Sequence, residues 1–131
     1  MNCGTGPGTR ISISDGRTEL KACLNDTAAA RDFLKRLPCR LNVSDSGEDY
    51  RCGTASGVFD PLETASRLEA GDISIGEGIF SMRYKGTESR GFSGVTVIGK
   101  LDRESIDRAA ELPERPVLTI KIDNGNESKK R

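Results

Sequence analysis

Hydrophobic and polar residues alternate along much of the chain, which is the period of a β-strand with one buried face. Tight-turn dipeptides, Asp15-Gly16 and Glu77-Gly78, separate two neighbouring pairs of these segments and are typical of hairpins. Eight segments show the alternation or lie between such turns, and each is predicted to be a strand: residues 10–14, 18–24, 40–44, 48–53, 72–76, 79–85, 92–101 and 117–122.

The alternation also assigns side chains to the two faces of a strand. In the segment 79–85, Phe80 and Met82 fall on one face and Arg83 falls on the other. In the segment 92–101, Val95, Val97 and Leu101 are predicted to align with one another on the buried face. Apolar side chains on one face of each strand predict a shared interior.

Two segments have the helical period instead. Residues 28–37 follow the possible cap Asn25-Asp26-Thr27, and Pro38 ends the segment. Asp102 precedes a second predicted helix over residues 103–112. The first helix has apolar residues at positions i, i+3, i+4 and i+7, which form one stripe: Ala30, Phe33, Leu34 and Leu37.

Many short alternating strands favour a closed barrel over an open parallel sheet, because closure removes exposed strand edges. We predict a mainly β fold, a closed antiparallel barrel of roughly eight strands capped by two helices. The barrel domain is expected to span residues 10–123, with a disordered leader over 1–9 and a disordered tail over 124–131. Residues 54–71 are the longest irregular stretch, which is where function is expected in a small domain.

Composition narrows the classes of partner. The chain has 131 residues, the length of one domain, with 20 basic and 20 acidic side chains. Balanced charge argues against a nucleic-acid partner, which would favour a basic surface. No stretch approaches the roughly 20 apolar residues of a membrane span, and the N-terminal sequence does not have the pattern of a secretion signal. We therefore expect no membrane partner and a cytoplasmic location.

The chain contains no histidine. Histidine is the usual general base near neutral pH and the commonest metal ligand, so triad chemistry is excluded and no metal or cofactor is predicted. The four cysteines, Cys3, Cys23, Cys39 and Cys52, do not have the spacing of a zinc site. In a reducing cytosol they are expected to be thiols, and a disulfide among Cys23, Cys39 and Cys52 is left open.

Three stretches carry a resemblance to a known group of proteins: TAAARDFLKRLP over 27–38, AGDI over 70–73, and residues 80–102, where FSMRYKG is followed by GFSGVTVIGKLD. Over about residues 10–123 the chain resembles the bacterial cyclophilin-like proteins of uncharacterised function. The resemblance implies a cyclophilin-like barrel. It does not imply prolyl isomerase activity, because the HRV phrase and the PGFMxQGGD motif of true cyclophilins are missing from the sequence.

Several aromatic and charged residues lie near the long irregular stretch or the strand ends, and we take them as candidate ligand-binding residues: Tyr50, Arg51, Phe59, Glu77, Arg83, Tyr84 and Phe92. A pocket needs an apolar wall and a few aimed polar groups, and Arg83 could pair with an anionic ligand or a carboxylate. The alternative interpretation places Phe59, Tyr84 and Phe92 in the core and makes Arg83 and Glu77 an exposed cross-strand pair.

The acidic residues Asp45, Glu48 and Asp49 form a further cluster, but their spacing does not fit a calcium loop. A solvated turn is the favoured interpretation. No catalytic residue is nominated.

We therefore predict a barrel that binds a small molecule or peptide in a cleft beside residues 54–71. A protein-interaction module, forming a homodimer, is the second hypothesis. A divergent prolyl isomerase is a third, disfavoured by the missing motif.

Overall fold

The computed structural model describes residues 8–53, 68–76, 78–86 and 95–123. Over these residues the chain forms nine strands and two helices. Their bounds are β1 (Thr9–Ser14), β2 (Glu19–Leu24), α1 (Ala28–Leu34), β3 (Cys39–Asn42), β4 (Ser44–Asp45), β5 (Asp49–Gly53), β6 (Asp72–Gly76), β7 (Ile79–Arg83), β8 (Val95–Leu101), α2 (Arg103–Ala109) and β9 (Val117–Ile122).

All nine strands belong to one antiparallel sheet that curls into a nearly closed barrel. The strand order is β3-β9-β1-β2-β8-β6-β7-β5-β4, so β3 and β4 are its two edges. These edges are consecutive in the chain and only Val43 separates them, so the segment 39–45 joins one end of the order to the other. The predicted mainly β barrel is confirmed. The count of nine strands arises because the single strand predicted over 40–44 is divided at Val43, whose N–H donates to the Pro116 carbonyl at 3.2 Å.

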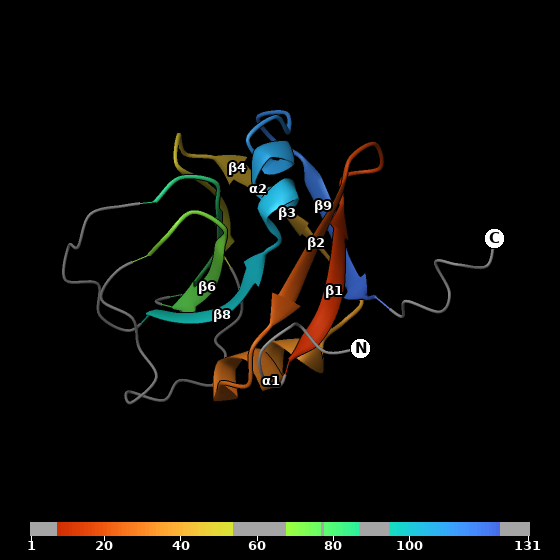
Figure 1. Cartoon of the computed structure of the whole chain (residues 1–131), viewed down its shortest axis with the longest axis vertical. Helices are drawn as coiled ribbons and strands as arrows, with labels where there is room; N and C mark the ends of the chain where they lie inside the picture. The colour runs from red at the N-terminus through yellow and green to blue at the C-terminus, as the bar shows by residue number, and fades with distance from the viewer. Residues whose placement is uncertain (1–7, 54–67, 77, 87–94, 124–131) are drawn as a thin grey trace.

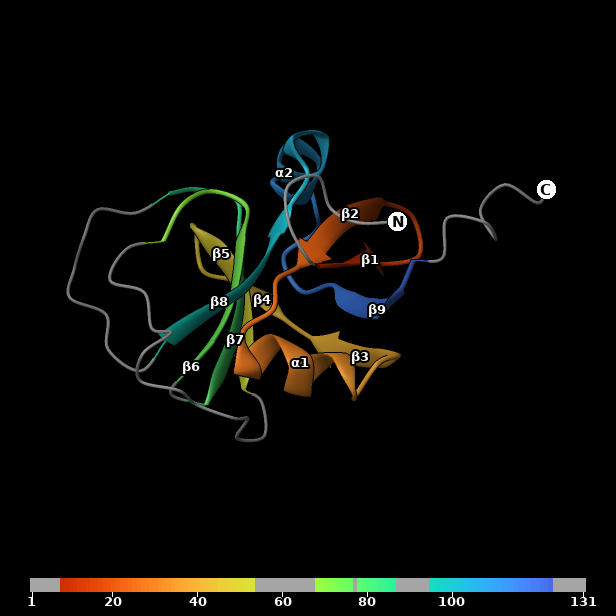
Figure 2. The same ribbon diagram turned by 60° about the horizontal axis from the view of Figure 1, so that its bottom comes forward.

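Two halves of the barrel are visible in Figures 1 and 2: β1, β2, β9 and β3 on one side, and β5, β6 and β7 on the other. β8 connects them because it pairs with β2 on one edge and with β6 on the other. At Gly99, β8 lies so close to β2 that an added Cβ atom would be 2.6 Å from the Cys23 carbonyl oxygen. Glycine is therefore required where the two halves meet.

Side chains on the inner faces of the strands form one core. Phe80 and Met82 are fully buried there, as predicted. The prediction for β8 is right for Leu101, which is buried. It is wrong for Val95 and Val97, which are only half-buried while Thr96 and Ile98 point inward. The physical reason is an irregularity in the pairing of β6 with β8, where the register skips one residue. Such a bulge changes which face each residue occupies, so one continuous alternation cannot describe the strand.

The two helices lie at opposite ends of the barrel in both views (Figures 1 and 2). α1 packs through Phe33, whose ring stacks on Phe80 with centroids 5.9 Å apart. Thr27 is the cap of α1, and its hydroxyl accepts the Ala30 N–H at 3.2 Å. The helix ends three residues before the predicted Leu37, because the backbone tightens there into hydrogen bonds between residues three apart.

The second predicted helix also ends early, at Ala109. Asp102 precedes it as predicted, but its side chain makes no capping hydrogen bond. The carboxylate instead pairs with the guanidinium of Arg10 on β1 at 2.9 Å. A contact between distant segments thus replaces the local one that the sequence suggested.

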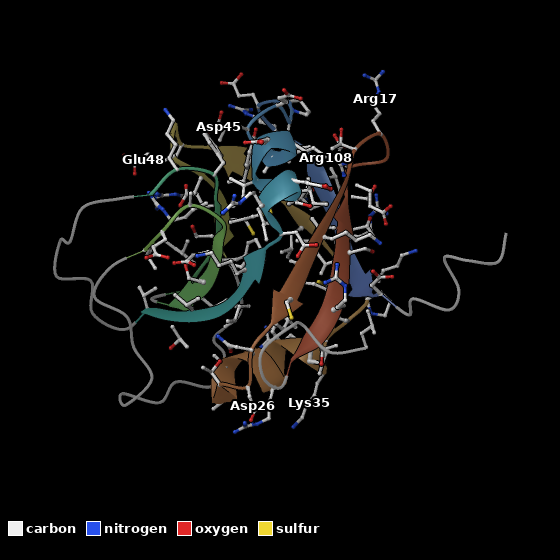
Figure 3. All side chains as sticks on the ribbon, viewed as in Figure 1. Arg17, Asp26, Lys35, Asp45, Glu48 and Arg108 are labelled. Carbon is white, nitrogen blue, oxygen red and sulfur yellow. The ribbon has the colours of Figure 1, made fainter. Side chains whose placement is uncertain are left out.

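Charged side chains surround the barrel without segregation by sign. Figure 3 shows Asp26 and Lys35 near α1, and Arg17, Arg108 and Glu48 toward the opposite end. This mixture agrees with the zero net charge of the sequence. In the part of the chain that the structure describes, neither helix has the length and apolar character needed to cross a membrane.

Candidate functional site

The pairing of β5, β7 and β6 gathers polar side chains on the outer face of the barrel. Asp49 on β5 lies opposite Arg83 on β7, and Arg51 lies opposite Ser81. Ser81 in turn lies opposite Ser74 on β6. Outward-facing residues of a barrel are normally solvated, yet all of these except Arg51 are buried. Burial of polar groups without partners is costly, so their hydrogen bonds define the site.

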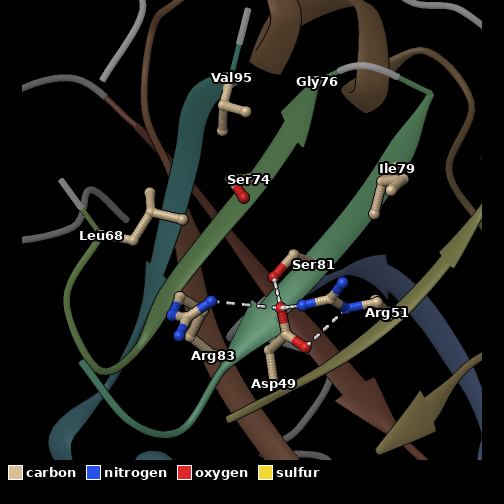
Figure 4. A pocket seen from close by; sticks show the side chains of 9 residues that line it. All are labelled: Asp49, Arg51, Leu68, Ser74, Gly76, Ile79, Ser81, Arg83 and Val95. Carbon is tan, nitrogen blue, oxygen red and sulfur yellow. Dashed lines mark hydrogen bonds and ion pairs between the residues drawn. The ribbon is translucent and has the colours of Figure 1, made fainter. Parts of the chain in front are cut away.

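Asp49 is the centre of this polar cluster, and its side chain is 1% exposed. The hydroxyls of Ser46 and Ser81 donate to its carboxylate at 2.6 and 2.5 Å. Arg51 donates to both carboxylate oxygens, from Nε at 3.0 Å and from Nη2 at 3.3 Å. Arg83 Nη1 donates at 3.4 Å. Figure 4 shows the two guanidinium groups approaching Asp49 from opposite sides.

These contacts determine the protonation state of Asp49. Burial by itself would raise the pKa of this carboxyl group, but the hydrogen bonds from Ser46, Ser81 and Arg51 outweigh burial and lower the pKa below its usual value of 3.8. Asp49 is therefore ionised at neutral pH. Asp72, a second buried aspartate, behaves in the opposite way: burial raises its pKa, and the Glu69 N–H and Lys100 compensate only in part.

The two aspartates predict opposite effects of pH on stability. A lowered folded-state pKa gives Asp49 a stabilising contribution above the unfolded pKa, and this contribution is lost as the pH falls through the folded value. A raised folded-state pKa gives Asp72 a contribution that is present at low pH and lost as the pH rises. Urea unfolding of wild type, Asp49→Asn and Asp72→Asn between about pH 6 and about pH 3 measures both.

We expect the stability advantage of wild type over Asp49→Asn to shrink on acidification. The advantage over Asp72→Asn is expected to grow over the same range. Parallel changes in the two variants would contradict the opposite pKa shifts.

Arg83 is a supporting residue of the cluster. Its side chain is 4% exposed, and its Nη2 donates to the Glu48 carboxylate at 2.7 Å. Its Nε donates to the Lys85 carbonyl at 3.0 Å. The interpretation of Arg83 as part of an exposed cross-strand pair is therefore wrong, because the side chain is buried. Its ion pairs with Asp49 and Glu48 compensate the cost of burying the charge. The solvated-turn interpretation is wrong for Asp49 for the same reason.

Beside this cluster the outer face is hollowed into a pocket of about 140 Å³. Gly76 and Ser74 form its floor, and their small size leaves the space that larger side chains on a strand would fill. Figure 4 shows the charged groups at one end of the pocket and Val95 and Ile79 toward the other, with Leu68 at the side. The lining residues in the described part of the chain are Asp49, Arg51, Leu68, Ser74, Gly76, Ile79, Ser81, Arg83 and Val95.

The structure brings only some of the predicted site residues together. Arg51 and Arg83 line the pocket. Tyr50 and Tyr84 belong to the interior side of the barrel, where their rings pack 5.5 Å apart. The remaining predicted residues, Phe59, Glu77 and Phe92, lie outside the described residues, as does the stretch 54–67 beside which the cleft was predicted.

The interior tyrosines hold polar groups that stabilise the fold. The Tyr50 hydroxyl donates to the Leu112 carbonyl at 2.7 Å. The Tyr84 hydroxyl donates to the Asp45 carboxylate at 2.6 Å. Burial and this carboxylate together raise the pKa of Tyr84 to about 12, so the hydroxyl is a donor at neutral pH and not a base.

The cysteines supply no activated nucleophile in the described structure. Cys23 is disulfide-bonded, which corrects the expectation of a thiol at this position. Cys39 and Cys52 are free and half-buried. Burial raises the pKa of both thiols, which lowers the thiolate fraction at neutral pH.

Several pocket residues were missed from the sequence, namely Asp49, Leu68, Ser74, Gly76, Ser81, Ile79 and Val95. The alternation did place Arg83 on the outer face, but it could not show which residue of another strand lies opposite. Asp49 and Arg51, two positions apart on one strand, were the available signal. A carboxylate and a guanidinium on the same face of a strand are near enough to pair.

The described residues 8–53, 68–76, 78–86 and 95–123 include no group of three or more acidic or cysteine side chains arranged to hold a metal ion. The acidic residues of the turn are engaged elsewhere: Asp49 by its serine and arginine partners, and Asp45 by Tyr84. The geometry therefore describes an ion-paired cluster and not a cation site.

The fold and the site define a small antiparallel β-barrel with a mixed polar and apolar pocket on its outer face. The sequence model described as the Cyclophilin-like family matches residues 13–121, and the chain belongs to this family. Among solved structures, the fold is similar to the solution structure of a hypothetical protein from Archaeoglobus fulgidus, with a TM-score of 0.68 and 17% identity. That likeness covers 92% of this chain and 100% of the other. No curated protein matches the sequence.

Proposed function

We propose that the barrel binds a small molecule or a short peptide in the outer-face pocket bounded by β5, β7, β6 and β8. The observation that carries the proposal is the burial of Asp49, Ser74, Ser81 and Arg83 on an outward face. Buried charged groups that adjoin a hollow on the surface are more common at binding sites than elsewhere on a protein. Ligand pockets combine such fixed polar groups with an apolar wall, which Leu68, Ile79 and Val95 supply here.

The other hypotheses have less support. Three large apolar side chains in the described structure are exposed by more than a third, Ile79, Val117 and Ile122. Val117 and Ile122 are the first and last residues of β9, and Ile79 is on β7, so they do not form one patch suited to a homodimer. The described pocket lining contains no aromatic side chain to receive a proline, so an isomerase stays disfavoured. The cytoplasmic location remains a prediction.

A pocket-filling substitution tests the proposal. A library of small acids, amines, neutral metabolites and dipeptides is screened by thermal shift against the intact chain. A compound that binds the native state stabilises it by about 2.7 kcal/mol at 100 times its dissociation constant. We expect Ser74→Leu to abolish the shift, because the added side chain occupies the floor of the pocket.

The matched control is Thr9→Leu, which makes the same kind of change at a half-buried position of β1 in the other half of the barrel, outside the described lining of the pocket. It should leave the shift intact. Ser74→Val serves as a smaller substitution if Ser74→Leu fails to fold. Failure of the whole library, or equal binding by Ser74→Leu and wild type, would reject the pocket as the binding site.

A further inference from the structure

We infer that the ligand of this pocket carries a carboxylate on a short branched aliphatic group, and that Arg51 binds the carboxylate. This inference rests on the proposed function and names its ligand class. It follows from which charged groups of the pocket still have hydrogen-bonding capacity, and from the shape and chemistry of the opposite end.

Asp49 cannot serve a ligand. One carboxylate oxygen accepts from Ser46 and Arg51, and the other accepts from Ser81, Arg51 and Arg83. The side chain is also 1% exposed. A carboxylate oxygen accepts about two hydrogen bonds, so a cationic or hydroxyl-bearing ligand finds no acceptor there. The Asp49 carboxylate therefore orients the neighbouring side chains and does not bind the ligand.

Arg51 is the charged group that a ligand can reach, because its side chain is 47% exposed. Its Nε and Nη2 donate to Asp49, so one edge of the planar guanidinium is fixed against the carboxylate. A guanidinium has five N–H groups in a rigid fork. Asp49 accepts from Nε and from Nη2, so the edge formed by Nη1 and the second N–H of Nη2 is not occupied by this carboxylate. Two parallel donors on such an edge match the two oxygens of a carboxylate.

The cluster holds this donor edge in place before any ligand arrives. Asp49 anchors Arg51, and Arg83 and Ser81 in turn anchor Asp49. A donor whose geometry is already fixed loses less conformational freedom on binding. Among the described residues, Arg83 is neutralised by Glu48, whose carboxylate lies 2.7 Å from its guanidinium, and Asp49 neutralises Arg51. Arg51 therefore offers a ligand a fixed and accessible donor edge and not an excess of positive charge.

The opposite end of the pocket determines the rest of the ligand. Leu68, Ile79 and Val95 provide aliphatic contacts, and Gly76 leaves the space between the last two. The volume of about 140 Å³ is close to that of a cavity that holds one benzene molecule, roughly 150 Å³. A branched group of about four carbon atoms fits this space. A free branched-chain carboxylic acid and the C-terminal valine or leucine of a peptide share this chemistry.

The test compares probes that differ in one feature, titrated into the full-length protein and followed by NMR chemical shifts. The first series is 3-methylbutanoate, its neutral amide, the corresponding amine, and acetate, which lacks the branched group. The second series is N-acetyl-Gly-Val with a free carboxylate or a C-terminal amide. We expect each carboxylate to bind at least about 10-fold more tightly than its amide, since a hydrogen bond to a charged group contributes more than a neutral one. Stronger binding by the peptide acid than by 3-methylbutanoate would identify a peptide as the source.

Substitutions at Arg51 locate the interaction. Arg51→Gln should weaken 3-methylbutanoate binding at least about 10-fold, whereas Arg51→Lys should retain part of the affinity because it keeps the charge without the fork. Arg40→Gln, at an exposed position of β3, is the matched control and should bind as wild type does. Far-UV circular dichroism and the unfolding midpoint verify that each variant is folded.

The outcomes separate the two proposals. If the amide or the amine binds the pocket as tightly as the carboxylate, the carboxylate inference is overturned and the binding pocket stands. If Arg51→Gln binds the acid as wild type does, the assignment of Arg51 is overturned. If neither series shifts any resonance of the pocket residues at millimolar concentrations while the broader library yields a ligand, only the ligand class is wrong. If the library also fails, the proposed function falls with it.

Discussion

Asp49→Ala should lower the free energy of unfolding by about 3 kcal/mol, a large fraction of the stability of a domain of this size. The substitution removes the acceptor of two hydroxyl groups and two guanidinium groups at once. Arg83 then keeps a side chain that is 4% exposed, and among the described residues the half-exposed Glu48 is its remaining ionic partner. Removing one member of a buried ion pair is costly because the other charge remains desolvated.

The measurement is urea unfolding at neutral pH, with Asp32→Ala as the control. Asp32 also pairs with an arginine, Arg36 at 2.8 Å, but both belong to a partly exposed i,i+4 pair on α1. Its removal should cost roughly 0.5 kcal/mol. A double-mutant cycle with Arg83→Met should show coupling between Asp49 and Arg83. A loss below about 1 kcal/mol in Asp49→Ala would mean that the cluster does not support the barrel in the way we describe.

Gly99→Ala is expected to destabilise the barrel to a similar extent, by up to about 3 kcal/mol. The added Cβ atom would lie 2.6 Å from the Cys23 carbonyl oxygen and 3.1 Å from the Leu24 Cα atom. Both are backbone atoms of β2, so no side-chain rotation relieves the overlap. The strands must separate where β2 and β8 pair, which is the contact that joins the two halves of the barrel.

Gly53→Ala is the control, because it also adds one methyl group to a strand glycine. The nearest atom to its added Cβ, the Gly78 carbonyl oxygen, is 3.8 Å away, which is an ordinary contact. Its effect should stay within about 0.5 kcal/mol. Amide hydrogen exchange should show lost protection in β2 and β8 of Gly99→Ala. Equal stability of the two variants would show that the halves can separate there without cost.

The positions of most strands along the chain could be predicted because they depend on local pattern. Alternating residues such as Leu20, Ala22 and Leu24 are all buried in the structure, as their spacing implies. A strand with one apolar face must bury that face against other strands or helices. The predictions that failed, for the faces of β8 and for the cap at Asp102, share one cause. The bulge in the pairing of β8 with β6 and the ion pair of Asp102 with Arg10 both depend on segments far away in the chain.

The candidate site could be predicted only in part. Arg51 and Arg83 were found because they are charged residues near the long irregular stretch or a strand end, where a pocket needs a few aimed polar groups. Asp49 was assigned to a solvated turn because its partners, Ser81 and Arg83, are more than 30 residues away in the sequence. Tyr50 and Tyr84 were included for their residue type, although the alternation places them on the face opposite Arg51 and Arg83.

The sequence alone therefore determined the class of fold, because strand and helix periods are properties of neighbouring residues. It also excluded histidine-based chemistry, since composition does not depend on folding. Only the tertiary structure decided which outward-facing side chains are buried together, because the pairing of β5, β7 and β6 sets their distances. The pocket and its fixed guanidinium edge are consequences of strand register, which no single segment of the chain contains.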